Sequence, residues 1–370
     1  MLVTEEIRGD AAMAKMAREW DDLLHNGRCG GFFQTWEWVM CCRRHFGAGK
    51  PLSLITVRDD GKLVGLAAME TTLMYGLPLR RLQFIGTGTS DYLDFLLLDG
   101  YEESALQEII RWITHHKSRW DLVDLQQFPE NSPTLDVIPS IDLSAEYTIR
   151  LLKQEVCPYL PLAESWEACS SGLGKKMRSN LGYYERLLRR DFEVSIAALE
   201  PHELDEGMTA FFDLHTQRWR KRWLPGMLAD GKRQKFHREL AKMAHKRGWL
   251  RLHGIRINGE LQSVLYCFAH KNKAYYYLGG FDPALSRYSI GTVLTGHAIR
   301  DAIESGCEEF DFLRGDEAYK SRWTSDERWN HRLVLSRNNL RSKIASSIVN
   351  LERRIEQRVK RELHKRIGAG

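Results

Sequence analysis

The sequence predicts an α/β fold of the α+β kind, built from two domains that each contain a mixed, mostly antiparallel sheet flanked by helices, with a further helix at the C-terminal end. Three observations lead to this prediction. The 370 residues are about 2.5 times an ordinary domain, and 43% of them are hydrophobic, enough for two cores. One order of elements also occurs twice along the chain. The expected parts are residues 1–150, residues 151–336 and a helix over residues 337–370.

The first copy begins with helices and continues with a hairpin. Apolar residues recur at helical spacing over residues 14–24, and a second helix is expected over residues 36–46. Leu52–Val57 and Leu63–Thr71 have the composition of strands, and the sequence Asp59-Asp60-Gly61 between them suits a hairpin turn. The pattern then predicts two short strands, an amphipathic helix and a last strand, over residues 82–85, 92–98, 106–113 and 122–126.

The second copy repeats this order later in the chain. Leu252–Ile257 and Leu261–Phe268 flank Asn258-Gly259, which predicts a second hairpin. The two hairpins even share a spelling, because Arg58-x-x-Gly61-x-Leu63 recurs as Arg256-x-x-Gly259-x-Leu261. A strand, a helix and a last strand are then expected over residues 274–278, 291–304 and 310–313.

Two polar helices are expected between the copies. The first starts at Lys175 and carries Lys175, Lys176 and Arg178 on a cationic face. The second spans about residues 201–223, and its apolar stripe ends in polar residues that include His215 and Arg218. Trp219 lies on the same helix, within two turns of His215. An Arg on such a stripe needs a partner or an anionic ligand, whereas a lone His there is commonly a packed core residue.

Composition excludes several classes of protein. No apolar stretch approaches the roughly 20 residues that span a bilayer, and the start of the chain lacks the basic and apolar regions of a signal peptide. The seven cysteines form no C-x-x-C pair, so neither a disulfide framework nor a zinc ribbon is expected. The thirteen histidines show no ligand spacing beyond His115-His116, and we expect no metal. These features favour a protein of the reducing cytoplasm.

The net charge of +5 is unevenly distributed. Residues 337–370 hold ten Lys and Arg against three Glu, a local charge of +7, so the rest of the chain is close to neutral. This argues against nucleic acid as a general partner. Within the same segment Leu340, Ile344, Ile348, Leu351, Ile355, Val359 and Leu363 recur every three to four residues. Such a helix can pack on the body, pair with another chain, lie on the anionic inner face of the plasma membrane or hold an anionic nucleotide.

The stretch from Tyr275 to Trp323 holds the first candidate site. A strand ends at Gly279-Gly280, and the following loop contains Arg287, Ser289 and Gly291 before a helix begins. Glycines let a ligand approach the backbone, and a helix N-terminus offers free N–H groups, so this loop suits a pyrophosphate. The alternative is that Gly291 merely allows a tight turn from strand to helix.

The second candidate site follows the next strand. Arg314, Asp316, Glu317, Tyr319 and Lys320 come directly after the apolar run at residues 310–313. Carboxylates such as Asp316 and Glu317 can take a proton from an acceptor, and a phenol such as Tyr319 can give one to a leaving group. The alternative is a solvated loop with local salt bridges.

Lys175 to Trp323 resembles a known family. These residues are similar to GNAT-fold acetyltransferases of the CelD type, which serve cellulose and exopolysaccharide biosynthesis and are themselves similar to Fem-like peptidyltransferases with two GNAT domains. The resemblance covers about 150 of 370 residues. The matching pieces, in order, are Lys175-Lys176-x-Arg178-x-x-Leu181, Leu214-His215-x-x-Arg218-Trp219, Tyr277-Leu278-Gly279-Gly280-Phe281-Asp282-Pro283, Ser289-x-Gly291-Thr292 and Phe310-Asp311-Phe312-Leu313-Arg314-Gly315 with Tyr319-Lys320-x-x-Trp323.

The resemblance implies acyl transfer from an acyl-coenzyme A, usually acetyl-coenzyme A, to an amine or hydroxyl. Pantetheine would lie along Leu278 and Gly279, and the loop Arg287–Thr292 would hold the pyrophosphate through Arg287, Ser289, Gly291 and Thr292. The usual cradle has Arg or Gln, two residues, then Gly; here three residues separate Arg287 from Gly291. The implied catalytic residues are Asp316 or Glu317 as base and Tyr319 as acid. The expected acceptor-binding residues are His215, Arg218, Trp219, Arg314 and Lys320.

The candidate sites and the family resemblance lead to three candidate functions. The leading one is acylation of a small or lipid-linked sugar precursor during synthesis of exopolysaccharide or the cell envelope, by direct transfer in the cytoplasm or at the inner face of the plasma membrane. The second is Fem-like transfer of an aminoacyl group from a charged tRNA to a cell-wall precursor, with strong salt dependence. The third is a non-catalytic adaptor that recruits the polysaccharide-synthesis machinery.

Overall fold

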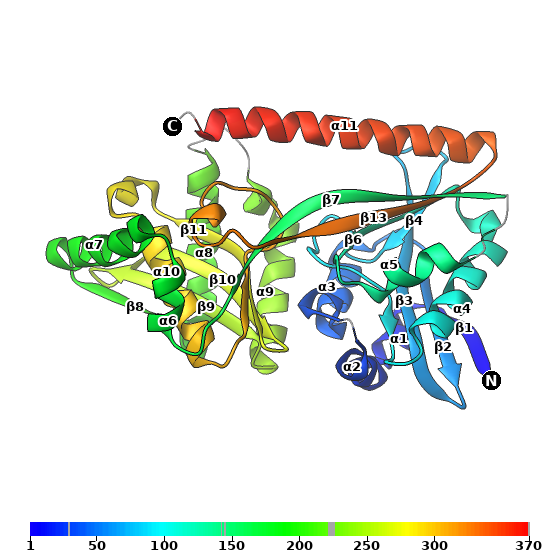
Figure 1. The fold of residues 1–370 in the computed structure, drawn as a ribbon, viewed down its shortest axis with the longest axis horizontal. Helices are drawn as coiled ribbons and strands as arrows, with labels where there is room; N and C mark the ends of the chain where they lie inside the picture. The colour runs from blue at the N-terminus through cyan, green and yellow to red at the C-terminus, as the bar shows by residue number, and fades with distance from the viewer. Residues whose placement is uncertain (29, 142, 144–145, 221–225, 369–370) are drawn as a thin grey trace. The chain divides into compact units, whose positions relative to one another are not determined.

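The computed structural model describes residues 1–370 except 29, 142, 144–145, 221–225 and 369–370 (Figure 1). The chain divides into two compact units. The first unit comprises Met1–Val156 and Arg328–Gly370, and the second comprises Cys157–Glu327. Each unit contains a mostly antiparallel sheet and flanking helices, which confirms the predicted fold class. No helix among the described residues is both long enough and apolar enough to cross a membrane.

The first unit is built on the strand order β1, β2, β3, β4, β6, β13 and β7, with β5 paired to β3. Its one parallel pair among those whose register is known joins β4 to β6. The strands are β1 (Leu2–Ile7), β2 (Leu52–Asp59), β3 (Lys62–Leu73), β4 (Arg80–Phe84), β5 (Leu96–Leu97), β6 (Leu122–Phe128), β7 (Tyr147–Pro161), which ends in the second unit, and β13 (Glu327–Arg337). The helices are α1 (Asp10–Ala14), α2 (Ala17–Asn26), α3 (Trp36–Phe46), α4 (Glu102–His115), α5 (Pro133–Val137) and α11 (Leu340–Gly368).

The second unit has the strand order β7, β12, β11, β10, β9 and β8. Its parallel pair joins β11 to β12, at the place that β4 and β6 hold in the first unit. The strands that lie wholly in this unit are β8 (Val194–Ala198), β9 (Leu250–Ile257), β10 (Glu260–His270), β11 (Lys273–Phe281) and β12 (Glu309–Asp311). The helices are α6 (Trp166–Gly172), α7 (Lys175–Asp191), α8 (Leu204–Arg220), α9 (Gly231–Lys246) and α10 (Ile290–Glu304).

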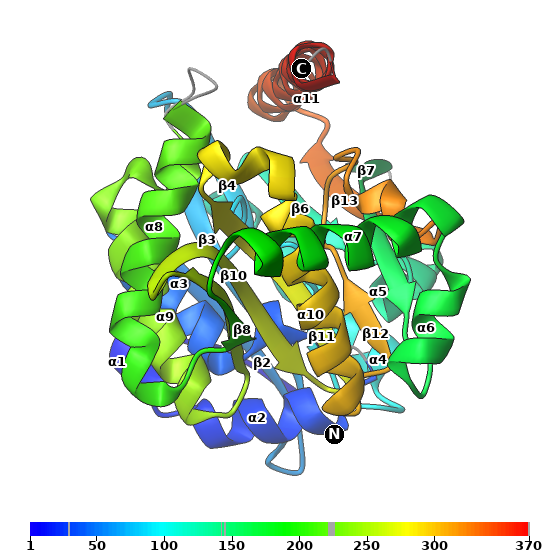
Figure 2. The same ribbon diagram turned by 90° about the vertical axis from the view of Figure 1, so that its left-hand side faces the viewer.

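Helices cover both faces of the sheet in the second unit. Helix α10 contacts β9, β10 and β11 on one face and is joined there by α7, whereas α8 contacts β10 and β11 on the other (Figure 2). The core on the α10 side includes Leu265, Ile299 and Phe310, all at most 2% exposed. The apolar spacing that predicts these helices therefore marks the side that each turns to the sheet.

The sequence motif that the two hairpins share adopts the same local structure in both. Asp60 and Gly61 both have positive φ, which is the geometry of the two-residue turn that Asp-Gly favours. The guanidinium of Arg58 donates to the carbonyl oxygen of Gly61 at 3.0 Å and is also bound by Glu19 of α2.

The second hairpin has the same arrangement. Asn258 and Gly259 have positive φ, and Arg256 donates to the carbonyl oxygen of Gly259 at 3.2 Å while Glu206 of α8 binds the same guanidinium. The two-copy prediction is thus supported by hydrogen bonds as well as by element order.

The C-terminal segment returns to the first unit, which the sequence analysis did not anticipate. Residues 328–336, expected to end the second domain, form most of β13, and β13 pairs with β6. Helix α11 follows directly and belongs to the same unit. The physical reason lies in a buried ion pair, because Arg332 binds Asp124 through two hydrogen bonds of 2.6 and 2.7 Å and both side chains are at most 3% exposed. Burying the Asp124 carboxylate without Arg332 would leave an uncompensated charge, so this pair favours the placement of β13 beside β6.

We predict that Arg332→Gln lowers the free energy of unfolding by about 3–5 kcal/mol, because Asp124 is left buried without its bidentate partner. Arg58→Gln is the matched control, since the Arg58–Glu19 pair is partly exposed and should contribute about 1 kcal/mol or less. Urea unfolding of both variants measures the difference. Equal losses would contradict the importance of the buried pair.

In the first unit the chain itself fills the space beyond the parallel pair. β4 and β6 pair only at Arg81–Leu122 and Leu82–Val123, and the segment after β4 then runs alongside β6. The N–H of Leu93 donates to the carbonyl of Gln127 at 2.9 Å. All residues from Ser90 to Leu98 are buried. Among the described residues, the first unit therefore fills with its own chain the position at which the second unit has an open strand edge.

A buried carboxyl anchors this segment. Asp94 accepts hydrogen bonds from the hydroxyls of Ser132 and Thr134 and from the N–H of Phe95. Burial is the dominant effect and raises the pKa of Asp94 from its ordinary 3.8 to about 6, against the opposing effect of these hydrogen bonds.

We predict that the first unit loses stability between pH 4 and pH 6 through Asp94. A pKa raised to about 6 means that the folded protein binds the proton more tightly than the unfolded chain. The contribution is complete below pH 4 and is lost as pH rises through 6, by roughly 3 kcal/mol. Asp94→Asn should remove this slope in urea unfolding across that range, whereas Asp99→Asn, at an exposed position, should keep it. A slope that persists in Asp94→Asn would contradict the assignment.

Candidate active site

The second unit opens between its parallel strands, β11 and β12. They pair through three residues only, and the last pair is Tyr275 with Asp311. β11 continues to Phe281, and among the described residues its strand partner beyond Tyr275 is β10, on one side. Backbone groups at a strand edge are strong donors and acceptors. The open edge of β11 can therefore bind an extended ligand in the way that it would bind a further strand.

A β-bulge lies on β11 beside this opening. The register with β10 pairs Tyr266 with Leu278 and then Cys267 with Tyr276, so Tyr277 is an extra residue. The backbone of Tyr277 hydrogen-bonds the Cys267 thiol, and burial raises the pKa of that thiol. Cys267 is thus a protonated packing group and not a nucleophile. Bulges bend a strand and re-aim its side chains, and they are frequent beside active sites.

The predicted anion loop leads from β11 into α10. Ser289 has a left-handed backbone with φ of 47°, and its carbonyl accepts the N–H groups of Thr292 and Val293 at 2.8 and 3.1 Å. Gly291 lies close to Phe281, since a Cβ there would be 3.2 Å from that ring. The first N–H groups of a helix lack acceptors within it and carry a partial positive charge. The start of α10 therefore lies beside the end of β11, as the sequence predicts.

Arg287, the expected phosphate ligand, is already ion-paired. Its guanidinium donates to the Asp191 carboxylate at 2.8 Å and to the Tyr288 hydroxyl. Hydrogen bonds from Arg190, Tyr288 and Arg287 lower the pKa of Asp191 to about 2, so this carboxylate is charged at neutral pH. Arg287 remains 68% exposed, and an anion can compete with Asp191 for it. Sequence reasoning missed Asp191 because it lies 96 positions earlier in the chain.

The loop after β12 is held by a buried lysine. The ammonium of Lys320 donates to the carbonyl oxygens of Leu313, Arg314 and Gly315 at 3.0, 2.8 and 3.2 Å. It also pairs with Glu317 at 2.9 Å, and the Lys320 side chain is only 4% exposed. Leu313 adopts a left-handed backbone, with φ of 60°, which is unusual for leucine. Lys320 was expected to bind substrate, but its donors are engaged inside the protein, and we assign it the role of fixing this loop.

The expected bases lie on the surface of the same loop. Asp316 and Glu317 are both exposed, and Arg314 is half-buried. Because Glu317 is the partner of Lys320, its charge is partly neutralised. Asp316 and Glu317 both remain candidates for the base.

Tyr319, the expected acid, lies beside a tyrosine that the sequence analysis did not select. Its ring centroid is 5.9 Å from that of Tyr276, which is also 6.1 Å from Phe312. The hydroxyl oxygen of Tyr276 lies so close to Gly279 that a Cβ there would be 2.8 Å from it. Tyr276 therefore places a phenol at the open edge of β11. Its position in a run of three tyrosines concealed it, although strand alternation puts Tyr276 on the same face as Ala274.

Comparison with known protein families agrees with this geometry. Residues 175–321 match the family model described as an acetyltransferase (GNAT) domain. The second unit contains a GNAT acetyltransferase domain. The protein is accordingly an acyltransferase, and its GNAT domain holds the open edge of β11, the start of α10 and the loop after β12. No curated protein sequence matches the chain.

Solved structures share the fold across both units. FemX has a TM-score of 0.65 at 12% identity and covers 94% of this chain and 99% of its own. A conserved protein of unknown function from Bacteroides thetaiotaomicron VPI-5482 has a TM-score of 0.56 at 10% identity, covering 91% and 100%. The C-terminal domain of a putative lysylphosphatidylglycerol synthetase from Agrobacterium fabrum has a TM-score of 0.55 at 11% identity, covering 92% and 97%. At these identities the likeness concerns the fold alone.

The residues expected on α8 lie on the other face of the GNAT sheet. His215 is 3% exposed and accepts a hydrogen bond from the Trp219 indole at 3.0 Å. A Cβ on Gly280 would be 2.7 Å from the His215 nitrogen of the backbone, so α8 packs closely on that face. The structure therefore separates His215 and Trp219 from Tyr276 and Tyr319, which pack on the α10 side. The side chain of Arg218 lies outside the described residues.

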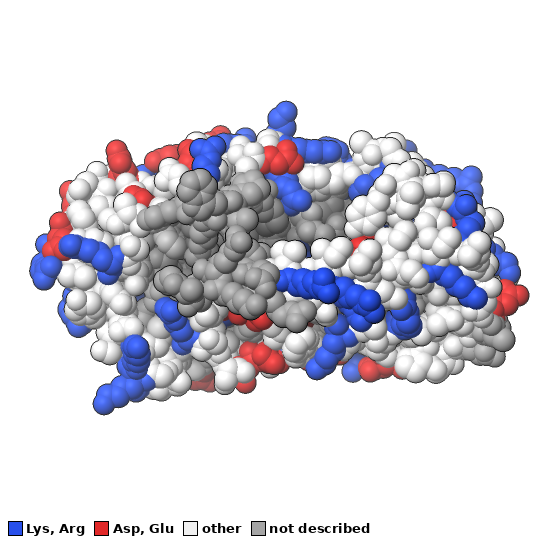
Figure 3. Space-filling view, turned by 90° about the horizontal axis from the view of Figure 1, so that it is seen from above, with Lys and Arg blue, Asp and Glu red and all other residues white. Residues whose placement is uncertain are grey.

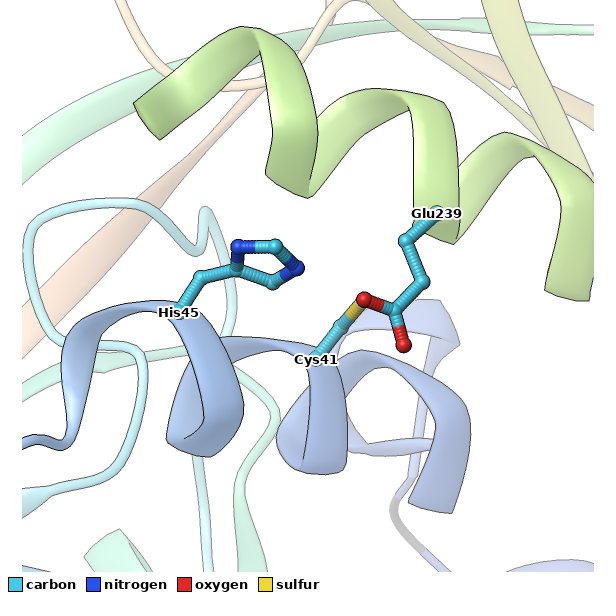
Figure 4. Close-up of side chains that lie close together, drawn as sticks. All are labelled: Cys41, His45 and Glu239. Atoms are coloured by element: carbon cyan, nitrogen blue, oxygen red, sulfur yellow. The ribbon is translucent and has the colours of Figure 1, made fainter. Parts of the chain in front are cut away.

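A possible metal-binding group gives no site in either unit. Figure 4 draws Cys41 and His45, one turn apart on α3 of the first unit, with Glu239 of α9 in the second. Burial raises the pKa of the Cys41 thiol to about 12, so this thiol is protonated at neutral pH when no cation lies beside it. The first unit supplies only two of these three residues, Cys41 and His45.

We predict that Gly280→Ala destabilises the GNAT domain by about 1–3 kcal/mol through overpacking. The added methyl group would meet backbone atoms of α8, which cannot rotate away: the His215 nitrogen at 2.7 Å and the Phe211 oxygen at 3.0 Å. Gly172→Ala, where nothing lies within 4 Å of the new Cβ, should change stability by about 0.5 kcal/mol at most. Thermal unfolding of both proteins makes the comparison, and equal melting temperatures would contradict the close packing of α8.

Proposed function

We propose that the second unit transfers an acyl group, most simply acetyl, from an acyl-coenzyme A to an amine or hydroxyl acceptor. One observation carries the proposal: pairing between β11 and β12 stops at Tyr275 and Asp311, which leaves the edge of β11 open beside the start of α10. The match to an acetyltransferase model over residues 175–321 supports the same reaction.

The residues present fit an acyl-coenzyme A in two places. The open backbone edge at Leu278 and Gly279 would bind the amide-containing pantetheine arm. Ser289, Gly291 and Thr292, at the positive end of α10, would hold the pyrophosphate, and Arg287 would join them only by giving up Asp191. When bound, the thioester supplies an activated carbonyl, and the protein supplies orientation and proton transfer.

Proton transfer is assigned to the loop after β12 and to β11. Asp316 or Glu317 takes the proton from the acceptor amine or hydroxyl, because a protonated amine is not a nucleophile. Tyr276 or Tyr319 gives a proton to the leaving thiolate, since the Tyr276 hydroxyl lies beside Gly279 and the Tyr319 ring lies next to that of Tyr276. Lys320 acts indirectly by fixing the loop that carries Asp316.

We propose that the acceptor is a sugar or a lipid-linked sugar precursor of exopolysaccharide or envelope synthesis. The protein would reach this acceptor from the cytoplasm. This part of the proposal depends on the sequence resemblance described above. The acceptor would approach from the loop 313–320, where Arg314 and Asp316 lie.

Aminoacyl transfer from a charged tRNA is the second candidate function. It is favoured by the exposed cations Lys175, Lys176 and Arg178 at the start of α7, in the same unit as the open edge. Binding of RNA to such a surface would weaken steeply with salt.

We predict that the protein binds acetyl-coenzyme A and that Gly291→Glu abolishes binding. A glutamate would add bulk and negative charge at the start of α10, next to Phe281. Gly231→Glu is the matched control, because it places the same residue in the first turn of α9, where nothing lies within 4 Å. Asp191→Asn should tighten binding, because it releases Arg287. Calorimetry measures the affinities, and ligand at 100 times its dissociation constant should raise the parent's stability by roughly 2.7 kcal/mol.

Each result separates the candidate functions. Binding by the parent and by Gly231→Glu, without binding by Gly291→Glu, supports the acyltransferase site. A different result would favour aminoacyl transfer over transfer from acyl-coenzyme A. In that case the parent binds charged tRNA and not acetyl-coenzyme A, and Lys175→Gln with Lys176→Gln weakens the binding of tRNA. Binding of neither ligand would overturn both in favour of an adaptor.

A further inference from the structure

Helix α11 carries an apolar stripe that the fold leaves exposed. Leu340, Ile344, Leu351, Ile355 and Val359 of α11 are 73%, 44%, 57%, 51% and 51% exposed. Their spacings of four, seven, four and four residues place them on one face of the helix. Single exposed apolar residues are ordinary, but a row of five on one helix is a contiguous surface.

A different face of α11 attaches the helix to the first unit. Ala345 and Val349 are buried against Met74, Leu79, Leu122 and Val334. Glu352 of α11 pairs with Arg81 and lies 3.6 Å from Arg332. The helix is thus held by small residues and by charges, and the exposed stripe is not needed to hold it in place.

Basic residues run beside the stripe. Lys343, Arg354 and Arg358 are exposed on α11, and helical periodicity places all three along one flank of the stripe. The sequence continues with Arg361 and Lys365 at the same spacing. In the view from the side of α11, Lys and Arg side chains lie next to uncharged atoms along the described part of the helix (Figure 3).

A second segment of the first unit adds apolar residues next to α11. Leu73, Tyr75 and Leu77, in and after the end of β3, are 61%, 73% and 45% exposed. The segment is tied to the helix, because Arg341 donates to the carbonyl oxygen of Pro78 and the Tyr75 hydroxyl hydrogen-bonds Glu352. We call Leu73, Tyr75 and Leu77, with the stripe and its three basic neighbours, the α11 surface.

We propose that the α11 surface binds the interface of an anionic phospholipid bilayer. A bilayer offers hydrocarbon to the stripe, phosphate groups to the basic flank and an interfacial layer that favours tyrosine at the position of Tyr75. A second copy of the chain is a poorer occupant, because pairing two stripes would bring two segments of local charge +7 together. The inference is independent of which acyl donor the second unit uses.

The test uses the full-length protein and sedimentation with vesicles. Vesicles of phosphatidylcholine alone are compared with vesicles that also contain phosphatidylglycerol. We expect binding to the anionic vesicles only, and a decrease of about 100-fold when Lys343, Arg354 and Arg358 are all changed to Gln. Leu351→Ser with Ile355→Ser should weaken binding by about tenfold. The matched control changes three exposed lysines of α9 to Gln, namely Lys232, Lys235 and Lys246, and should bind as the parent does.

Three outcomes would overturn the proposal. The first is no binding of the parent to anionic vesicles. The second is an equal loss in the α9 control, which would mean that total charge and not the α11 surface attracts the protein. The third is a lipid-free dimer that Leu351→Ser with Ile355→Ser dissociates, which would assign the stripe to a second copy. Circular dichroism of each variant confirms that it is folded before binding is compared.

Discussion

The early end of the pairing between β11 and β12 is the constraint on which the rest of the second unit depends. After Asp311 the chain leaves β11: the N–H of Phe312 donates to Pro158 of β7, and Leu313 adopts a left-handed backbone. Lys320 then holds the next three carbonyl oxygens, and this ammonium keeps the loop away from β11. Because the strands separate, the edge of β11 and the start of α10 face the same opening. A buried lysine thus fixes the loop that carries the candidate residues Asp316 and Glu317.

The first unit shows what happens when the same opening is filled. Its parallel pair, β4 with β6, also ends early, but the chain after β4 returns along β6 and buries its own side chains there. Asp94 secures this segment through hydroxyl donors, so its hydrogen-bonding groups are satisfied within the unit. The two units have the same order of elements, but they differ in what lies beside the parallel strand pair. One leaves a strand edge open, and the other covers that edge with its own chain and provides the surface on which β13 and α11 are held.

The sequence was informative where a short segment determines its own geometry. The two hairpins follow from Asp60-Gly61 and Asn258-Gly259, and even the repeated arginine proved to cap both turns. The sequence did not reveal interactions between residues that lie far apart in the chain. The pairing of Arg332 with Asp124 spans 208 positions, and that of Arg287 with Asp191 spans 96. For the same reason Lys320 could be selected as a functional residue but not recognised as the anchor of its own loop, and Tyr276 could not be placed beside Tyr319.

Helix α11 shows why periodicity alone does not say which face of a helix is buried. The apolar stripe that predicts the helix is mostly exposed, whereas the face that packs on the first unit includes Ser342 and Ala345. Small residues let the helix approach the sheet closely, and the ion pairs of Glu352 fix its register, so folding places no demand on the larger apolar side chains. An exposed row of Leu, Ile and Val is unfavourable in water unless something covers it. Since the neighbouring flank carries Lys343, Arg354 and Arg358, a surface that is both apolar and negative would complement the described part of the helix. Among biological surfaces, an anionic bilayer has both properties without any matching of side chains.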